Sequence, residues 1–172
     1  MPAAISRDGP PTNIKIRHVL KPGDIGYLTY LHGVLYAKEY GWDHTLEAYV
    51  APPLAQFAMS QTDRERIWIV EKDGETAGSI AIVESSKTEA QLRWLLLHPD
   101  VRGYGIGRLL VEEAIAFCRE SGYSSVFLWT VRGLLAAAHL YESAGFQLTE
   151  EKTHKVWGAV LTEQRLDLNL RS

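Results

Sequence analysis

The stretch that most constrains the fold is residues 92–118, where an apolar run, a glycine-rich loop and an amphipathic segment follow directly on one another. Gly103, Gly105 and Gly107 stand at every second position of the loop, between two arginines. This order predicts a strand, a tight turn and a helix whose first turn carries almost no side-chain bulk. A helix N-terminus has unpaired backbone N–H groups and a partial positive charge, and glycine lets an anion reach them. The sequence therefore predicts a phosphate or pyrophosphate site at this loop.

The spacing of the glycines differs from that of two widespread nucleotide-binding loops. A dinucleotide fingerprint needs Gly-x-Gly-x-x-Gly with an acidic residue about 20 positions later, and a P-loop needs Gly-Lys followed by Ser or Thr. The loop at residues 103–107 matches neither pattern. A tight turn that binds nothing stays open as the alternative, because short motifs have a high false-positive rate.

Length, charge and cysteine content narrow the class of protein. A chain of 172 residues fits one domain with a substantial core, and its net charge of -3 argues against general nucleic-acid binding. The single cysteine excludes an internal disulfide, and no apolar run reaches the length of a membrane-spanning helix. No pair of histidines has the spacing of metal ligands, so no metal is expected. We therefore expect a cytoplasmic protein without a nucleic-acid or membrane partner.

Hydrophobic periodicity and turn residues predict one α/β domain over residues 13–172, after a flexible tail at residues 1–12. The predicted strands are residues 13–19, 66–72, 76–84, 89–97, 123–130, 146–151, 155–161 and 165–170. The predicted helices are residues 24–40, 43–59, 104–121 and 133–143, the second of them kinked or split at Pro52-Pro53. The overall order is β-α-α-β-β-β-α-β-α-β-β, a mixed sheet with helices. Residues 155–170 offer a sheet edge at which a homodimer would pair.

Two motifs in register give the glycine-rich loop a more specific meaning. Arg102-x-x-Gly105-x-Gly107, placed between a strand and a long helix, resembles the acetyl-CoA signature of the GCN5-related N-acetyltransferase (GNAT) superfamily. Downstream, residues 140–146 (Leu-Tyr-Glu-Ser-Ala-Gly-Phe) look like the family's Leu-Tyr-x-x-x-Gly-Phe segment. The resemblance implies the GNAT fold, a mixed, mostly antiparallel six- to seven-stranded sheet flanked by helices. It also implies acetyl-CoA as the acyl donor.

A narrower resemblance covers residues 22–42. They are similar to the acetyltransferase domain that some bacterial proteins carry behind a MarR-type DNA-binding domain. Residues 1–12 are too short to form a winged-helix domain, so we expect a free-standing version of that acetyltransferase.

The resemblance assigns the donor-binding residues to the opening stretch. Backbone N–H groups of residues 102–108 would hold the pyrophosphate, and the exposed backbone of residues 95–97 would pair with the pantetheine arm. The strand at residues 123–130 would splay away to make that slot, and a backbone N–H at Leu97 or Leu96 would polarise the thioester carbonyl. The expected donor-binding residues are Leu95, Leu96, Leu97, Arg102, Gly103, Tyr104, Gly105, Ile106, Gly107 and Arg108.

The same resemblance suggests catalytic residues. Tyr141 is the acid expected to protonate or hydrogen-bond the sulfur, with a core aromatic as the open alternative. Candidates for the base are Glu84, at the end of a strand, and His154, which matches a histidine of the narrower group. Glu39 and Glu47, in the helical region at the acceptor side, and a water chain are the other candidates. Many relatives have Asn after the strand's Thr130, whereas this chain has Val131-Arg132. Arg132 could instead meet a cofactor phosphate.

The acceptor side is expected to involve Arg93, Glu39 and Trp42. By strand parity Arg93 shares a face with residues 95 and 97, where it could bind an acceptor carboxylate; a surface salt bridge is the alternative. Cys118 is expected in the core, which favours direct transfer. The expected function is therefore an acetyl-CoA-dependent N-acetyltransferase acting on the primary amine of a small-molecule or amino-acid-like acceptor. A catalytically silent acyl-CoA-binding regulatory module stays open as the second hypothesis.

Overall fold

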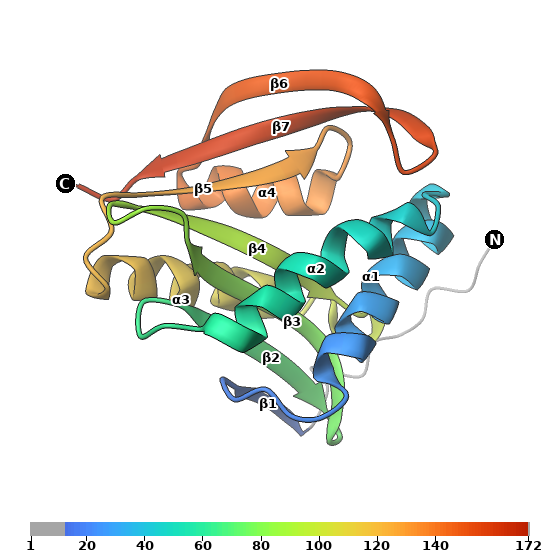
Figure 1. Cartoon of the computed structure of the whole chain (residues 1–172), viewed down its shortest axis with the longest axis horizontal. Helices are drawn as coiled ribbons and strands as arrows, with labels where there is room; N and C mark the ends of the chain where they lie inside the picture. The colour runs from blue at the N-terminus through green and yellow to red at the C-terminus, as the bar shows by residue number, and fades with distance from the viewer. Residues whose placement is uncertain (1–12, 172) are drawn as a thin grey trace.

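Seven strands and four α-helices follow one another in the predicted order β-α-α-β-β-β-α-β-α-β-β, although the strand ranges predicted at the C-terminus numbered three instead of two (Figure 1). The computed structural model describes residues 13–171, so the tail at residues 1–12 lies outside the described residues. The strands are β1 (Ile14–Arg17), β2 (Arg66–Lys72), β3 (Glu75–Glu84), β4 (Glu89–Leu97), β5 (Ser125–Val131), β6 (Gln147–Val156) and β7 (Ala159–Asn169). The helices are α1 (Asp24–Tyr40), α2 (Thr45–Ser60), α3 (Ile106–Glu120) and α4 (Leu135–Ala144), with a short 3-10 turn at Pro99–Val101. The predicted mixed, mostly antiparallel sheet flanked by helices is confirmed.

The strands form one sheet in the order β1-β2-β3-β4-β5-β7-β6. Every neighbouring pair is antiparallel except β4 and β5, which run parallel. The β4–β5 ladder covers only residues 89–91 against residues 125–127, so the two strands separate beyond Gln91. The sheet therefore opens in its middle, as predicted.

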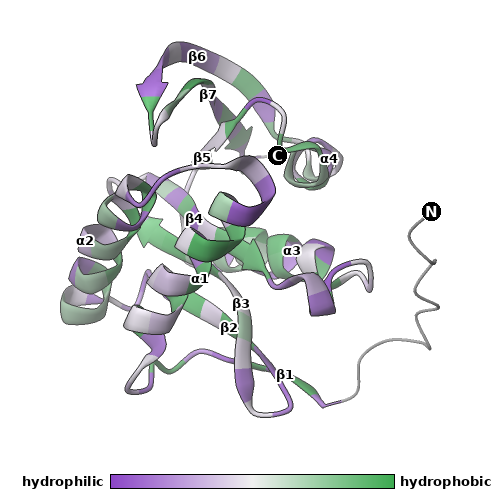
Figure 2. Ribbon diagram, turned by 90° about the vertical axis from the view of Figure 1, so that its right-hand side faces the viewer, coloured by the Kyte–Doolittle hydropathy of each residue, from purple (hydrophilic) through white to green (hydrophobic). Residues whose placement is uncertain are grey.

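Helices cover both faces of the sheet. The side chains of α3 pack with Trp68, Ile80 and Val126 on one face, and those of α1 and α2 pack with Ile67, Ile69 and Ala81 on the other. Figure 2 shows the strands at the middle of the molecule largely in the hydrophobic colour, with purple segments along β6. Cys118 is buried in the α3 side of the core, as predicted. Within residues 13–171, no helix combines the length and the hydropathy that a membrane crossing requires.

The C-terminal strands differ from the prediction. Two long strands, β6 and β7, replace the three short strands predicted at residues 146–151, 155–161 and 165–170, and a two-residue turn at Trp157-Gly158 joins them. Both turn residues have positive φ, 51° and 81°. Tryptophan is a poor residue for that conformation. Tertiary contacts compensate, since the Trp157 ring packs 4.9 Å from the ring of Trp42.

The second helix is also different, because α2 runs without a break through Pro52-Pro53. A proline inside a helix removes one backbone hydrogen bond and normally kinks or ends the helix. Here the buried residues lie on both sides of the pair, at Val50 and Leu54, and both pack against the sheet. Burial of that face favours helix on both sides of the prolines, so α2 is not split.

Strand β4 carries an irregularity that the sequence pattern does not reveal. Its register with β3 shifts between Arg93 and Leu96, and Trp94 has a positive φ of 53°. This extra residue is a β-bulge, which reverses the side-chain alternation. Arg93 therefore does not share a face with Leu95 and Leu97 as parity predicted: Trp94 packs on the α2 side and Leu95 on the α3 side.

Candidate functional site

The opening between β4 and β5 continues into a groove that we call the loop groove. It has a volume of about 390 Å³. Its lining comes from α1, from the end of β4, from the glycine-rich loop and from α4. The lining residues that the sequence assigned to donor binding are Leu95, Leu96, Leu97, Arg102, Gly103, Gly105, Gly107 and Arg108. The structure therefore gathers most of the predicted set along one wall.

The glycines allow a ligand to come close to the start of α3. Gly105 is the residue that precedes the helix, and its φ of 81° is one that side chains rarely adopt. A Cβ atom at Gly107 would lie 3.0 Å from Cδ1 of Leu140, so this position has no room for a side chain. Unpaired N–H groups at a helix N-terminus with little bulk fit a pyrophosphate. Tyr104 and Ile106, also predicted, pack toward the core, so only their backbone is suited to this role.

Arg102 and Glu39 form an ion pair across the loop groove, with 2.7 Å between nitrogen and oxygen. The Nε of Arg102 also donates to the carbonyl of Leu97 at 2.8 Å. These contacts hold the guanidinium against the end of β4. Glu39, which was predicted on the acceptor side, lines the loop groove together with the predicted donor-binding residues. Because the C-terminal end of α1 lines the groove, Glu39 can contact Arg102 of the glycine-rich loop.

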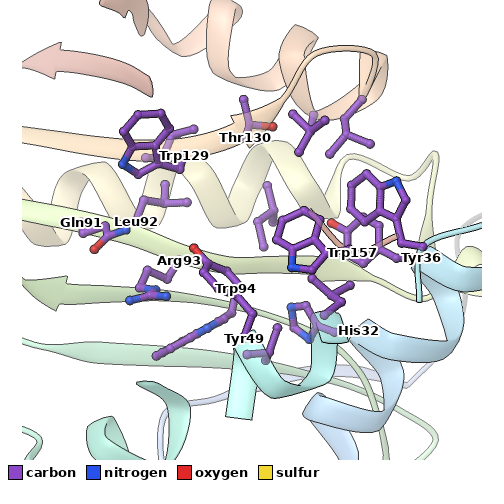
Figure 3. Close-up of a pocket in the computed structure, with 18 of the residues that line it drawn as sticks. His32, Tyr36, Tyr49, Gln91, Leu92, Arg93, Trp94, Trp129, Thr130 and Trp157 are labelled. Carbon is purple, nitrogen blue, oxygen red and sulfur yellow. The ribbon is translucent and has the colours of Figure 1, made fainter. Parts of the chain in front are cut away.

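A second hollow, which we call the aromatic cavity, lies on the α2 side of β4 and β5 (Figure 3). Its volume is about 130 Å³. Tyr36 stacks on Trp42 at 4.9 Å between ring centroids, and Trp157 closes against Trp42 from the β6–β7 turn. The polar and aromatic lining residues are His32, Tyr36, Trp42, Tyr49, Gln91, Arg93, Trp94, Trp129, Thr130, Tyr141 and Trp157. Trp42 therefore lies where the sequence predicted an acceptor residue.

The two hollows adjoin at one place. Both are lined by Tyr36 of α1, Leu95 of β4, Ala137 of α4 and Leu134, which directly precedes α4. Tyr141, one turn further along α4, lines the aromatic cavity beside this junction. A molecule that filled the loop groove would therefore present its inner end to a second molecule in the aromatic cavity.

Burial keeps the hydroxyl groups at the junction protonated. Tyr141 is 5% exposed, and its burial raises its pKa well above the ordinary value. Burial likewise raises the pKa of Tyr36 to about 12. A phenol that holds its proton at neutral pH is a hydrogen-bond donor rather than a base. Tyr141 can therefore donate to a group at the junction.

His32 is a functional candidate that the sequence reasoning missed. It is 4% exposed, and burial lowers its pKa to about 4, so the imidazole is neutral at pH 7. Its Nδ1 lies 2.7 Å from the carbonyl oxygen of Leu28, one helical turn earlier, and a carbonyl can only accept. The proton therefore sits on Nδ1, which leaves Nε2 as an acceptor in a residue that lines the aromatic cavity. A histidine on the buried face of a predicted helix was the only signal for it.

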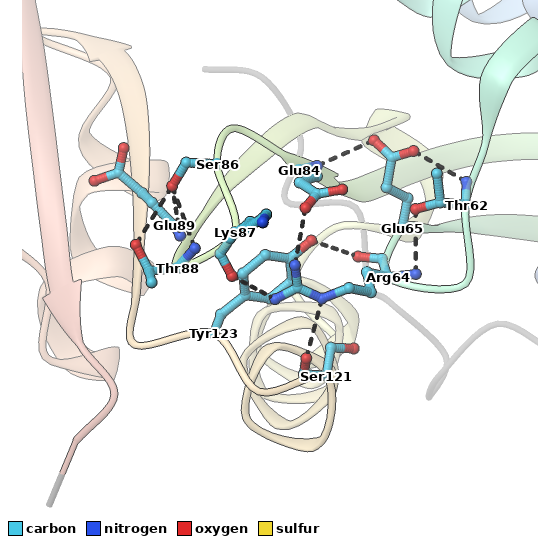
Figure 4. Close-up of polar contacts among 10 residues, drawn as sticks. All are labelled: Thr62, Arg64, Glu65, Glu84, Ser86, Lys87, Thr88, Glu89, Ser121 and Tyr123. Atoms are coloured by element: carbon cyan, nitrogen blue, oxygen red, sulfur yellow. Dashed lines mark hydrogen bonds and ion pairs between the residues drawn. The ribbon is translucent and has the colours of Figure 1, made fainter.

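Glu84 lies away from both hollows (Figure 4). Its carboxylate pairs with Arg64 at 2.8 Å, and Arg64 also donates to the carbonyls of Ser121 and Lys87. The guanidinium stacks over the ring of Tyr123 at 4.1 Å. The expectation that Glu84 faces the cleft is therefore wrong. It sits at the end of β3 where β4 and β5 are still paired, and it ties the end of α3 to the sheet.

His154 and Arg132 also lie outside the linings of both hollows. The Nε2 of His154 is 2.5 Å from a carboxylate oxygen of Glu163 on the neighbouring strand β7. Arg132 forms two hydrogen bonds of 2.8 Å to Glu151 of β6. Each side chain is thus held by a carboxylate of the β6–β7 hairpin. The structure does not bring His154 to Tyr141, nor Arg132 to the glycine-rich loop.

Comparison with known proteins identifies relatives of the chain. Residues 34–146 match the model of the acetyltransferase (GNAT) family. The chain is 33% identical over 147 residues to a Schizosaccharomyces pombe protein described as an uncharacterized N-acetyltransferase, covering 84% of this chain and 89% of that protein. It is 33% identical over 99 residues to human N-acetyltransferase 8B, spanning 55% of this chain and 44% of that protein.

Solved structures share the fold at lower identity. An acetyltransferase from Streptococcus agalactiae superposes with a TM-score of 0.75 and 20% identity, over 92% of this chain and 99% of that chain. An acetyltransferase from Salmonella typhimurium, determined with its cofactor acetyl-CoA, superposes with a TM-score of 0.72 and 18% identity, over 92% and 94% of the two chains. At such identities the likeness shows a shared fold alone.

Proposed function

Because the chain belongs to the GNAT family of acetyltransferases, we propose that it transfers an acetyl group from acetyl-CoA directly to the primary amine of a small-molecule or amino-acid-like acceptor. The observation that carries the proposal is the junction of two hollows at Tyr36 and Leu95. Direct transfer requires two substrates to meet at a single point, and the loop groove and the aromatic cavity meet there.

The loop groove is the proposed donor site. The N-terminus of α3 and the two arginines of the loop suit a pyrophosphate, and the β5-facing edge of β4 beyond Gln91 is free to pair with an extended chain. When bound, acetyl-CoA supplies an acetyl group activated as a thioester. Arg102 holds the end of β4 through its bond to Leu97, so that it braces the same edge.

Three groups at the junction divide the chemistry. The backbone N–H of Leu95 is proposed to polarise the thioester carbonyl. Leu95 is preferred to Leu96 and Leu97 because it is the β4 residue that lines both hollows. His32 Nε2 accepts the proton that the attacking amine loses as the N–C bond forms. Tyr141 donates its proton to the sulfur as the C–S bond breaks. A base and an acid that line the same cavity as Leu95 suit direct transfer without a covalent enzyme intermediate.

The test is turnover measured together with binding. The protein is mixed with acetyl-CoA and a panel of primary amines, and free thiol is followed against a blank without amine. Thermal shift with acetyl-CoA measures donor binding in the same samples, since a ligand at about 100 times its Kd adds roughly 2.7 kcal/mol. We expect both stabilisation and amine-dependent thiol release. Stabilisation without release on the whole panel would favour the silent regulatory module instead.

The narrower relationship to MarR-fused acetyltransferases and the homodimer are further parts of the proposal. Residues 22–42, which carry that resemblance, form α1 and its flanks and contribute Tyr36 and Trp42 to the aromatic cavity. Strand β6 is the last strand of the sheet and is exposed along most of its length, so it offers the edge for pairing with a second copy. Light scattering at several protein concentrations tests the homodimer by measuring the molecular mass in solution.

A further inference from the structure

Arg93 is the one charged side chain among the described residues that line the aromatic cavity. We propose that the acceptor is an amine that also carries a carboxylate, and that Arg93 binds this carboxylate. The proposal rests on the proposed N-acetyltransferase function and specifies its substrate class. It assigns Arg93 to specificity, separate from the chemistry at Tyr141.

The β4 bulge places Arg93 in the cavity. The reversal of alternation at Trp94 puts two consecutive side chains, Arg93 and Trp94, beside each other on the α2 side of the sheet (Figure 3). The guanidinium carbon lies 5.1 Å from the centroid of the Trp94 ring, a cation–π distance. The indole face thus supports the guanidinium from one side and leaves its edge of N–H donors for a ligand.

Arg93 forms no ion pair with Asp or Glu within residues 13–171, and the Trp94 ring is its cation–π neighbour. Six other arginines each form an ion pair with Asp or Glu: Arg17, Arg64, Arg102, Arg108, Arg132 and Arg165. Arg93 is half-buried, and its desolvation lowers its pKa. A buried cation without a counter-charge is costly, and a ligand carboxylate would relieve that cost through paired hydrogen bonds.

The remainder of the cavity is neutral and disfavours a purely cationic acceptor. Its lining contains no Asp or Glu among the described residues, and His32 is neutral. An ammonium group of a polyamine would therefore meet the positive charge of Arg93, with no anion in the lining to offset the repulsion. An acceptor that carries both an amine and a carboxylate would instead neutralise the charge of Arg93. Its amino group can then lose its proton and face the neutral Nε2 of His32.

Cavity size sets an upper bound on the buried part of the acceptor. A volume of about 130 Å³ holds about four water molecules at about 30 Å³ each, or a group somewhat smaller than benzene. That matches the medium apolar side chain of an amino acid, and the aromatic walls suit such a side chain. L-methionine, its amide and the corresponding amine without a carboxylate, 3-(methylsulfanyl)propylamine, therefore form a matched set of probes.

The first experiment compares these three probes in the acetyl-CoA assay. We expect kcat/KM for L-methionine to exceed that for the amide and the amine by at least about tenfold, the usual worth of a charge-assisted hydrogen bond. Equal or higher kcat/KM for the two probes without a carboxylate would overturn the carboxylate proposal while leaving the transferase standing. If no thiol is released with any of the three probes or with any other amine, the result counts against the transferase itself.

A binding measurement keeps the carboxylate proposal testable without turnover. Thermal shift is recorded with N-acetyl-L-methionine and with its amide, each in the presence of coenzyme A. We expect the acid to stabilise the wild-type protein more than the amide does. No preference for the acid in the wild-type protein would overturn the proposal even if no amine were acetylated.

Variants at Arg93 locate the preference. Arg93→Gln should abolish the preference for the acid, raising its KM at least about tenfold with little change for the amide, and Arg93→Lys should restore part of it. Arg119→Gln, which removes an exposed arginine at the end of α3, is the matched control and should keep the preference. The shift with acetyl-CoA alone shows whether each variant is folded. Retention of the full preference in a folded Arg93→Gln protein would assign the carboxylate to another residue.

Discussion

The loop groove and the aromatic cavity adjoin each other but are built in opposite ways. About half of the residues that line the loop groove come from one continuous stretch, residues 95–108, which contributes a strand end, a loop and the start of a helix. The aromatic cavity draws on α1, α2, β4, β5, α4 and the β6–β7 turn, so its walls come from segments far apart in the sequence. A site made of neighbours in sequence can be predicted from a motif, whereas a site made by packing cannot.

The largest expected effect is on the free energy of unfolding and comes from protonation of His32, which lines the aromatic cavity. His32 has a pKa of about 4 in the folded protein and about 6.5 when unfolded, so only the unfolded chain takes up its proton between those values. The free energy of unfolding should therefore fall by about 3 kcal/mol as the pH drops from 6.5 to 4. Urea unfolding at several pH values measures it, and His32→Gln should flatten this part of the profile. An equal slope in both proteins would show that His32 is not buried neutral.

Tyr141→Phe tests the junction of the two regions. Loss of the hydroxyl should lower kcat by about 100-fold and leave the KM for acetyl-CoA nearly unchanged, because general-acid groups act in the transition state. Tyr123→Phe is the matched control: Tyr123 is also buried, but its hydroxyl donates to the carbonyl of Arg64 at 2.8 Å. It should cost about 1 kcal/mol of stability without changing kcat. A similar kcat for both variants would remove Tyr141 from the mechanism.

Gly105→Val should damage the loop groove alone. A β-branched side chain at a φ of 81° strains the loop and covers the approach to the helix N-terminus. The KM for acetyl-CoA should rise about 30-fold, while binding of an N-acetylated product analogue in the aromatic cavity stays the same. Gly122→Val carries the same strain, with a φ of 82°, at the other end of α3. If both variants raised the KM alike, strain and not access would be the cause.

Gly158→Ala should do the reverse and damage the aromatic cavity alone. Its Cβ atom would lie 2.7 Å from Oδ2 of Asp43, and an alanine at a φ of 81° is strained, so we expect the β6–β7 turn to shift and carry Trp157 with it. The acceptor KM should rise about tenfold with an unchanged KM for acetyl-CoA. Gly74→Ala is the control, since that hairpin glycine has a φ of 80° and open space around it. A rise in the donor KM would show that the two regions are coupled.

Glu84→Gln should have the smallest effect. The pair with Arg64 is partly exposed, so its loss should cost less than about 1 kcal/mol of stability. Because Glu84 lines neither hollow, kcat/KM should stay within about twofold of wild type. A loss of activity in a protein of normal stability would return Glu84 to the list of candidate bases.

The sequence by itself determined the order of the elements, the glycine-rich loop and the place of Tyr141. Each depends on residues within one or two turns of each other, where periodicity, glycine and helix ends act locally. Tertiary structure alone decided which face Arg93 occupies, because one extra residue in β4 reverses alternation without a signature in the sequence. It also decided that Trp157 lies in the β6–β7 turn and packs on Trp42, and that the imidazole of His32 is buried in its neutral form. Desolvation and packing come from neighbours distant in the chain, and therefore the aromatic cavity, unlike the glycine-rich loop, could not be located from a sequence motif.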